Sequence, residues 1–318
     1  MIEVHGYAKQ GAGFGYSKVR GLNALLATVA TGRSAPVIVA QRLRKGSASS
    51  ARGAGRLTAD ALAVVRSLRP AGAVSRVLLR ADSAFYGHAA IGAAVRAGAQ
   101  VSVTVRMDPK VKAAIAAIGD DAWITVEYPG AVWDEETGRW ISRAEVAEIP
   151  FTAFSSRKQA EQVPGRLVVR RIPDINAPDG QDTLFELWRF HAFFTTSSLD
   201  TVTADKTHRG HAVIEQVNAD LKNSALAHLP SGRFAANSAW LACAVMAFNL
   251  TRAAAALAGG RLARATTATI RRALISVPAR ISRSARRLTL HLPAAWPWQQ
   301  AWTELFTTAC GPPLPVAS

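Results

Sequence analysis

Ionisable side chains recur at helical spacing in the segment HRGHAVIEQVNADLK, which runs from His208 to Lys222. At about 100° per residue, a helix here would gather four of them within roughly 60° on one face: His208, His211, Glu215 and Lys222. An apolar stripe would project from the far side and pack inward: Val213, Ile214, Val217 and Leu221. A carboxylate among cations suits a metal ion or a phosphate, whereas most polar helix faces of this kind are simply solvated.

A second carboxylate, Asp82, ends the segment VSRVLLRAD, which has the pattern of a buried strand. Sheets in α/β proteins commonly carry functional groups at this end of a strand. The side chain could cap the following helix or bind a metal. Mg²⁺ prefers carboxylate, phosphate and water oxygens, and two such ions roughly 3.5–4 Å apart promote in-line phosphodiester displacement. Such a site needs about three converging acids, here including Asp82 and Glu215, with Lys222 and the two histidines holding phosphates.

Positive charge is the strongest signal in the composition: 38 Lys and Arg oppose 22 Asp and Glu, a net charge of +16. No acidic residue occurs between Val4 and Ala59, which contain nine Lys and Arg, and none occurs between Leu221 and Thr303. Surfaces of one sign attract polyanions, and nucleic acid is the commonest one for a basic protein. A coding bias toward arginine would explain the abundance of Arg but not the missing acids.

Alternating and helical patterns predict an α/β fold. Residues 1–45 should form two or three antiparallel strands, followed by a helix from Leu57 to Leu68, the strand before Asp82, a helix over SAFYGHAAIGAAVRAG and the strand AQVSVTVRM. Residues 124–190 change to short strands, with DEETG as a hairpin turn, and we interpret them as a β-rich insertion. The helix AANSAWLACAVMAFNLTRAAAALA contains polar Asn237, Asn249 and Arg252, so we expect a core helix and no membrane span.

With two cysteines and no signal peptide pattern, a reducing cytoplasmic setting close to the nucleoid is expected. The last segment is rich in Arg and Pro, and its WPWQQAW stretch should dock on the body of the protein.

Five blocks, in order, resemble the DDE transposases of bacterial insertion sequences, most closely the insertion-sequence-1380 family: GYAKQGAGFGYSKVRGLNALL, RGAG, LLRADSAFYG, HRGHAVIEQVNADLK and AHLPSGRFAANSAWLACAVMAFNL. The resemblance implies a ribonuclease H-like mixed sheet flanked by helices, with a β-strand insertion before the helix of the catalytic Glu. It divides the chain into part of the catalytic core (1–123), the insertion (124–190), the remaining core (191–258) and a basic tail (259–318).

The resemblance also implies roles for particular residues. Asp82 matches the second catalytic Asp and Glu215 the catalytic Glu, so both would bind Mg²⁺, or Mn²⁺ in its place, in a two-metal site. Lys222 matches a phosphate-binding Lys of the family's signature helix, whereas His208 and His211 stand where the family has Tyr and Arg. Arg209 is a further candidate for phosphate binding. An aromatic residue of the insertion would stack on a displaced base, and the candidates are Trp123, Trp133, Trp140 and Trp188.

The first catalytic Asp of the family lies in a segment ending Asp-Ser-Thr, just upstream of the stretch that matches IEVHGYAKQGAG. This sequence has no Asp before Asp60, and Glu3 is the only acidic residue in that region. We therefore expect an N-terminally truncated transposase that lacks one metal ligand and any N-terminal DNA-binding segment, with cleavage severely weakened.

Three functions remain open from the sequence. The first is an impaired transposase acting on double-stranded DNA at transposon ends, alone, as a homo-oligomer or in mixed oligomers with the full-length protein. The second is a non-catalytic, transposase-derived DNA-binding protein that occupies those ends. The third is a generic metal-dependent nuclease on the same fold.

Overall fold

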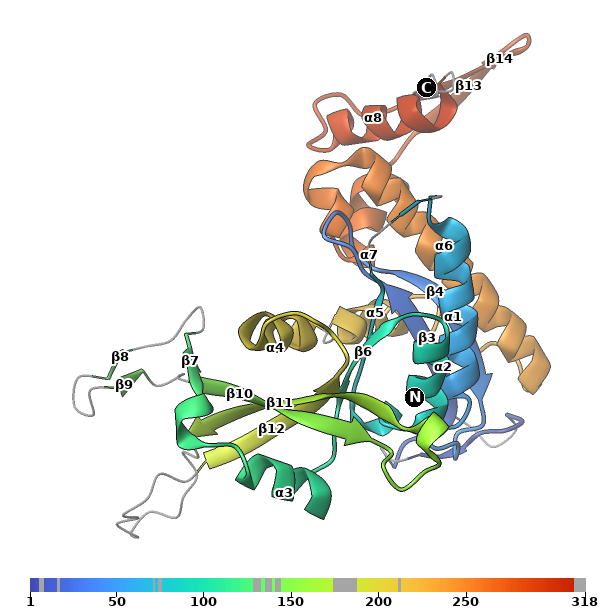
Figure 1. Cartoon of the computed structure of the whole chain (residues 1–318). Coiled ribbons are helices and arrows are strands. Elements are labelled where there is room, and N and C mark those ends of the chain that lie inside the picture. The colour runs from blue at the N-terminus through green and yellow to red at the C-terminus, as the bar shows by residue number, and fades with distance from the viewer. Residues whose placement is uncertain are drawn as a thin grey trace. The chain divides into compact units, whose positions relative to one another are not determined.

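A computed structural model of the chain describes residues 1–5, 9–15, 18–70, 72–73, 76–127, 133–134, 139–140, 144–173, 188–210 and 213–311 (Figure 1). It contains two compact units. The first unit joins residues 1–49 to residues 213–318, and the second comprises residues 50–212. The division into four parts after residues 123, 190 and 258, which the resemblance implied, stays a prediction.

The second unit is built on a six-stranded mixed sheet with the strand order β5-β6-β12-β11-β10-β7. Strands β5 (Leu78–Ala81) and β6 (Gln100–Thr104) are parallel. The other neighbours pair antiparallel: β12 (Trp188–Thr195), β11 (Val163–Pro173), β10 (Ala144–Ala153) and β7 (Ile124–Val126). The predicted α/β class and the strand before Asp82 are confirmed. Among the strands expected between residues 124 and 190, β7, β10, β11 and β12 extend this sheet from β6 outward.

Alternation along the strands gives this sheet two apolar faces. Leu167 and Val169 of β11 pack with Phe194 of β12 in the main core, on the side covered by α3 (Pro109–Ala116). Val168, between them, packs on the other side with Phe193 and Ala204, where α4 (Thr201–Arg209) lies. Helices α3 and α4 therefore cover opposite faces of the sheet (Figure 1).

Two further helices of this unit lie against each other: α1 (Ala54–Leu68) and α2 (His88–Arg96). A Cβ added at Gly55 of α1 would lie 2.6 Å from the carbonyl oxygen of Ala89, so a glycine is needed for this close approach. Ile91 and Ala94 of α2 are fully buried in the main core. Both helices were predicted, although α1 begins three residues before Leu57. Strand β8 (Trp133–Asp134) pairs antiparallel with β9 (Arg139–Trp140). The hairpin turn predicted at DEETG falls on residues 134–138, of which 135–138 lie outside the described residues.

The first unit begins with an antiparallel sheet of four strands where two or three were expected: β1 (Ile2–Glu3), β2 (Gly13–Phe14), β3 (Arg20–Val29) and β4 (Val37–Arg44). Helices α5 (Val213–Lys222) and α6 (Phe234–Ala258) complete its core. Leu22 and Ile38 of the sheet contact this core together with Leu221 and Leu241 of the two helices.

Helix α6 is long and apolar enough to cross a membrane by length and composition alone. In this structure it is a core helix, as predicted, because one side is packed and its polar residues are bonded within the fold. Asn237 is fully buried and exchanges two hydrogen bonds with the backbone of Ser231. Asn249 does the same with Ile38 of β4. Leu241 and Phe248 belong to the apolar core.

After α6 the chain folds into η5 (Gly260–Arg264), α7 (Thr267–Ile270), the π-helical turn η6 (Arg271–Ile275), the hairpin β13 (Arg280–Ser284) and β14 (Arg287–His291), and α8 (Gln299–Cys310). Trp298 and Trp302 pack against a small core formed by Ala255, Ile270 and Leu274. This agrees with the expected docking of the WPWQQAW stretch.

Candidate active-site residues

Asp82 stands directly after β5, where the sequence placed it, and its side chain is exposed. It is the N-cap of the short helical turn η1 (Ser83–Phe85), and its Oδ1 accepts a hydrogen bond of 2.6 Å from the backbone N–H of Ala84. The capping role is therefore observed. One hydrogen bond leaves acceptor capacity on a carboxylate, so capping and metal binding are compatible at this residue.

Glu215 and Lys222 both lie on α5 with exposed side chains. Seven residues are almost two helical turns, so the two side chains share one side of the helix. Val217 and Leu221 are buried in the core of the first unit, and Ile214 packs against it. The predicted amphipathic pattern of this helix is confirmed from Val213 onward. Asp82 and Glu215 belong to different units of the chain.

The single helix expected from His208 to Lys222 is wrong, because α4 ends at Arg209 with Gly210 as its C-cap and α5 begins at Val213. Glycine is unfavourable inside a helix and common where one ends. His211 lies outside the described residues. Arg209 forms an ion pair of 3.0 Å with the buried carboxylate of Asp205, one turn earlier.

His208 is buried, with 6% of its surface exposed, and packs on the sheet. Its ring lies parallel to that of Phe193, with centroids 4.0 Å apart. Nδ1 is 2.9 Å from the Ser102 hydroxyl, and Nε2 is 3.0 Å from the Thr104 hydroxyl. The expectation that His208 shares an exposed face with Glu215 is therefore wrong. These contacts favour a structural role over phosphate binding, because both ring nitrogens already face hydroxyl groups.

Two of the four tryptophan candidates hold an arginine between them. The Arg171 guanidinium lies 4.2 Å from the ring centroid of Trp123 and 4.4 Å from that of Trp188. The same guanidinium forms an ion pair of 2.6 Å with Glu145 on the neighbouring strand. Both rings are thus used in cation–π contacts, which favours a packing role. Trp133 and Trp140 pair across β8 and β9, and their base stacking stays a prediction.

A match to a known family decides the assignment. A family model described as "Transposase DDE domain group 1" matches residues 2–309. The chain belongs to this family of DDE transposases. No curated protein matches the chain.

Membership of this family supports a function in transposition, DNA as the partner and divalent metal ions as the usual cofactor of the group. The donor chemistry of Asp82 and Glu215 fits such an ion, because both are exposed carboxylates. Within the described part of the chain, however, no three His, Cys, Asp or Glu side chains lie together as a metal-binding group.

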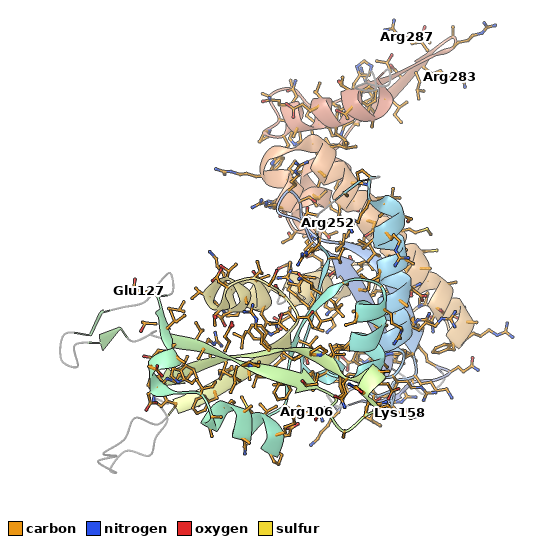
Figure 2. The ribbon with its side chains drawn as sticks, in the orientation of Figure 1. Arg106, Glu127, Lys158, Arg252, Arg283 and Arg287 are labelled. Carbon is orange, nitrogen blue, oxygen red and sulfur yellow. The ribbon has the colours of Figure 1, made fainter. Side chains whose placement is uncertain are left out.

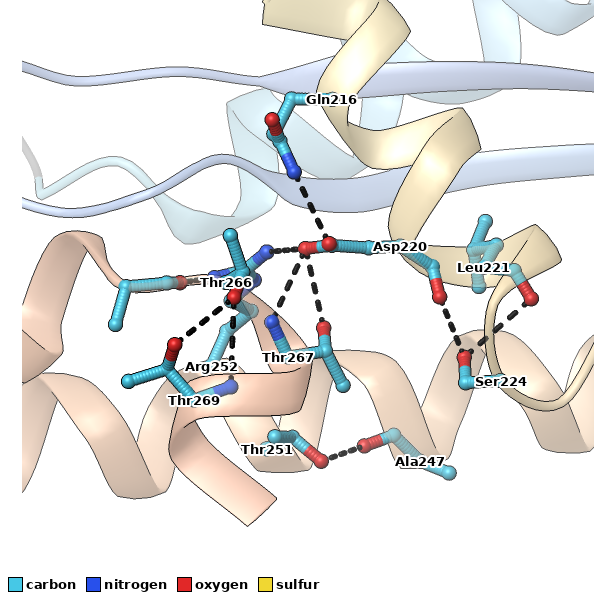
Figure 3. A network of polar contacts seen from close by, with 11 residues as sticks. Gln216, Asp220, Leu221, Ser224, Ala247, Thr251, Arg252, Thr266, Thr267 and Thr269 are labelled. Atoms are coloured by element: carbon cyan, nitrogen blue, oxygen red, sulfur yellow. Dashed lines mark hydrogen bonds and ion pairs between the residues drawn. The ribbon is translucent and has the colours of Figure 1, made fainter. Parts of the chain in front are cut away.

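The sequence pattern did not indicate a buried acid on the helix that carries Glu215. Asp220 has 6% of its surface exposed and forms an ion pair with Arg252 of α6 (Figure 3). Asp220 also accepts hydrogen bonds of 3.2 Å from both the backbone N–H and the hydroxyl of Thr267, and one of 3.0 Å from Gln216. Burial lowers the pKa of Arg252, while the carboxylate of Asp220 raises it. This network joins α5, α6 and the start of α7, so it fixes the helix that carries Glu215.

Arg80 on β5 provides a comparable anchor beside Asp82. Its Nη1 donates a hydrogen bond of 2.7 Å to the carbonyl oxygen of Thr207, in the last turn of α4. Burial lowers the pKa of this guanidinium. A cation is favourable at a helix C-terminus, where carbonyl groups lack partners. The strand that ends at Asp82 is thereby tied to α4.

Proposed function

We propose that this chain is an insertion-sequence transposase of the insertion-sequence-1380 type, with a ribonuclease H-like core, acting on double-stranded DNA at transposon ends. The observation that carries the proposal is the family match over residues 2–309. Further support comes from the positions of two matched carboxylates: Asp82 is exposed at the end of β5 and Glu215 is exposed on α5.

In this proposal Asp82 and Glu215 hold divalent cations, Mg²⁺ or Mn²⁺. When bound, such ions activate the attacking oxygen and stabilise the leaving oxygen of a phosphodiester. The protein's contribution is positioning. The hydrogen bond from Ala84 restrains the Asp82 carboxylate, and the Asp220–Arg252 network holds α5 in place. Lys222, on the same side of α5 as Glu215, supplies a positive charge for a DNA phosphate.

DDE chemistry uses three acidic ligands, and the 318 residues supply matched candidates for two of them, Asp82 and Glu215. We therefore propose that this chain by itself cleaves DNA weakly. DNA affinity depends on the basic surface and should persist.

The test uses the purified 318-residue protein with duplex DNA that carries the transposon ends, in Mg²⁺ or Mn²⁺. We expect binding that weakens steeply as salt is added and very little nicking. The variants Asp82→Asn and Glu215→Gln should remove whatever nicking remains while leaving DNA affinity close to that of the wild type. Efficient nicking by the wild type contradicts the impairment, and residual nicking that survives both substitutions contradicts the assignment of the carboxylates.

A second candidate is a non-catalytic DNA-binding protein that occupies transposon ends, alone or in mixed oligomers with a complete transposase. Two sequence features favour it: the 318 residues supply matched candidates for only two of the three acidic ligands, and long segments contain no acidic residue. Binding without any nicking, even in Mn²⁺, would select this candidate. Salt-insensitive or undetectable DNA binding would contradict both.

A further inference from the structure

The hairpin β13–β14 presents all ten of its strand residues to solvent. Its register pairs Arg280 with His291 and Ser284 with Arg287, leaving a turn of two residues. Figures 1 and 2 show the hairpin extending beyond α8, with Arg283 and Arg287 on its outer part. A two-stranded ribbon without a packed face is marginally stable on its own in water. This ribbon contributes no residue to the buried cores of its unit. Contacts with a binding partner would stabilise it.

Cross-strand pairing divides the hairpin side chains between two faces. One face carries only polar groups: Arg280, Ser282, Ser284, Arg287, Thr289 and His291. On it, the Ser282 hydroxyl and His291 Nε2 are 2.9 Å apart. The opposite face carries Arg283 with three exposed aliphatic residues: Ile281, Leu288 and Leu290, which are 65%, 70% and 44% exposed. Arg286 occupies the turn.

Charge identifies the partner of the polar face. The hairpin and its turn carry four arginines and no acid, within a segment from Leu221 to Thr303 that contains no acid at all. Guanidinium groups bind phosphates and the major-groove edge of guanine through paired hydrogen bonds. Serine and threonine hydroxyls contact either base edges or phosphates. This set of donors is complementary to duplex DNA.

We propose that the β13–β14 hairpin inserts into the major groove of duplex DNA, with its polar face toward the base edges. The proposal rests on the proposed function and assigns it a second contact, separate from the carboxylates. The major groove is about 12 Å wide and admits a two-stranded ribbon. Five residues of strand are about 17 Å long, roughly half a helical turn of DNA. Arg280 and Arg287 reach guanine edges, while Arg283 and Arg286 bind the flanking phosphates.

The first test measures how affinity depends on salt for a mixed-sequence duplex of about three helical turns. Replacing Arg280, Arg283, Arg286 and Arg287 with Ala should reduce the slope of log K against log salt by about 2, because two phosphate contacts are lost and each removes close to one unit. The matched control replaces four exposed cations of the other unit with Ala: Arg66, Arg96, Lys112 and Lys158. Its slope should change by less than about one unit. Equal effects of the two variants would overturn the proposal.

The second test locates the groove with dimethyl sulfate, which methylates guanine N7 in the major groove and adenine N3 in the minor groove. The wild type should protect guanines. The double variant Arg280→Ala/Arg287→Ala should lose this protection while keeping most of its salt dependence, because Arg283 and Arg286 still contact the phosphates. Protection confined to adenines would overturn the major-groove assignment.

Failures of the two proposals are distinguishable. A wild-type protein that binds no DNA at low salt contradicts the proposed function itself. A wild type that binds DNA, with a four-Ala variant that binds it equally well, overturns only the hairpin proposal. So does a four-Ala variant whose sedimentation coefficient changes in the absence of DNA, because the hairpin would then be a contact between copies of the chain. Unfolding curves of the variants should match the wild type, since the four side chains are exposed.

Discussion

Residues that look alike in the sequence have very different environments in this member of the DDE transposase family. His208 and Lys222 both belong to the ionisable pattern, yet His208 is buried and Lys222 is exposed. Periodicity reports the side of a helix on which a residue lies, but only while the helix continues. The helix ends at Arg209, so the angles calculated across Gly210 no longer apply. The role of His208 then depends on its contacts with Phe193, Ser102 and Thr104.

A substitution at His208 separates its two possible roles. His208→Ala should lower the free energy of unfolding by about 2–4 kcal/mol, because it leaves a cavity beside Phe193 and removes the partner of two hydroxyl groups. Urea unfolding followed by circular dichroism measures this change. The control His228→Ala, at an exposed position, should stay within about 0.5 kcal/mol of the wild type. If His208 binds phosphate instead, DNA affinity will fall while the stability stays unchanged.

Most elements could be predicted because their signals are local. The strand before Asp82 and the helices α1, α2 and α6 follow from apolar periodicity and from helix-breaking residues. Helix α3 was missed although a local signal existed. Asp108 and Pro109 form a typical helix start, and the Asp108 carboxylate accepts a hydrogen bond from the N–H of Val111.

Long-range partners could not be predicted from a single sequence. Asp220 and Arg252 are 32 residues apart, and neither has a local pattern that points to the other. The same holds for Arg171 between Trp123 and Trp188, which come from separate strands and loops. Asp82 was selected because a carboxylate follows a predicted strand, and Glu215 because it falls on the ionisable face of a predicted helix; both stay candidates.

The Asp220–Arg252 network gives a prediction at the scale of helices. Arg252→Met should lower the free energy of unfolding by about 3–5 kcal/mol, because the buried Asp220 carboxylate would lose its counterion. Arg252 also lies 4.9 Å from the ring centroid of Phe248 and donates to the carbonyl oxygen of Ala265, so α6 and the segment before α7 should loosen together. Urea unfolding measures the loss of stability.

The double variant Asp220→Leu/Arg252→Met is the matched control for this network. Replacing both ions with apolar groups removes the unpaired charge, and we expect it to recover a large part of the lost stability. If the double variant is as unstable as Arg252→Met, the hydrogen bonds of Asp220 to Thr267 and Gln216 matter more than its charge.

At the scale of the whole molecule, the net charge of +16 is divided unequally between the two units. The first unit has 18 Lys and Arg against 4 Asp and Glu, a net charge of +14. The second unit has 20 against 18, a net charge of +2. The two sequence segments that lack acids fall mainly in the first unit. The excess of positive charge, which is divided between two distant segments of the sequence, therefore belongs to one folded unit.

This distribution predicts where charge reversal affects DNA binding. Fields of exposed charges are screened over about 10 Å at an ionic strength of about 0.1 M, so the local surface decides the rate of encounter more than the total charge does. Reversing three exposed cations of the first unit to Glu should slow association with duplex DNA by about tenfold or more. The three cations are Lys18, Arg33 and Lys45.

The same reversal of Arg66, Arg96 and Lys112 should have a smaller effect, because the cations of the second unit are interspersed with nearly as many acids. Stopped-flow fluorescence with labelled duplex measures both rates. Since the two variants have the same total charge, equal slowing would mean that net charge alone governs the encounter.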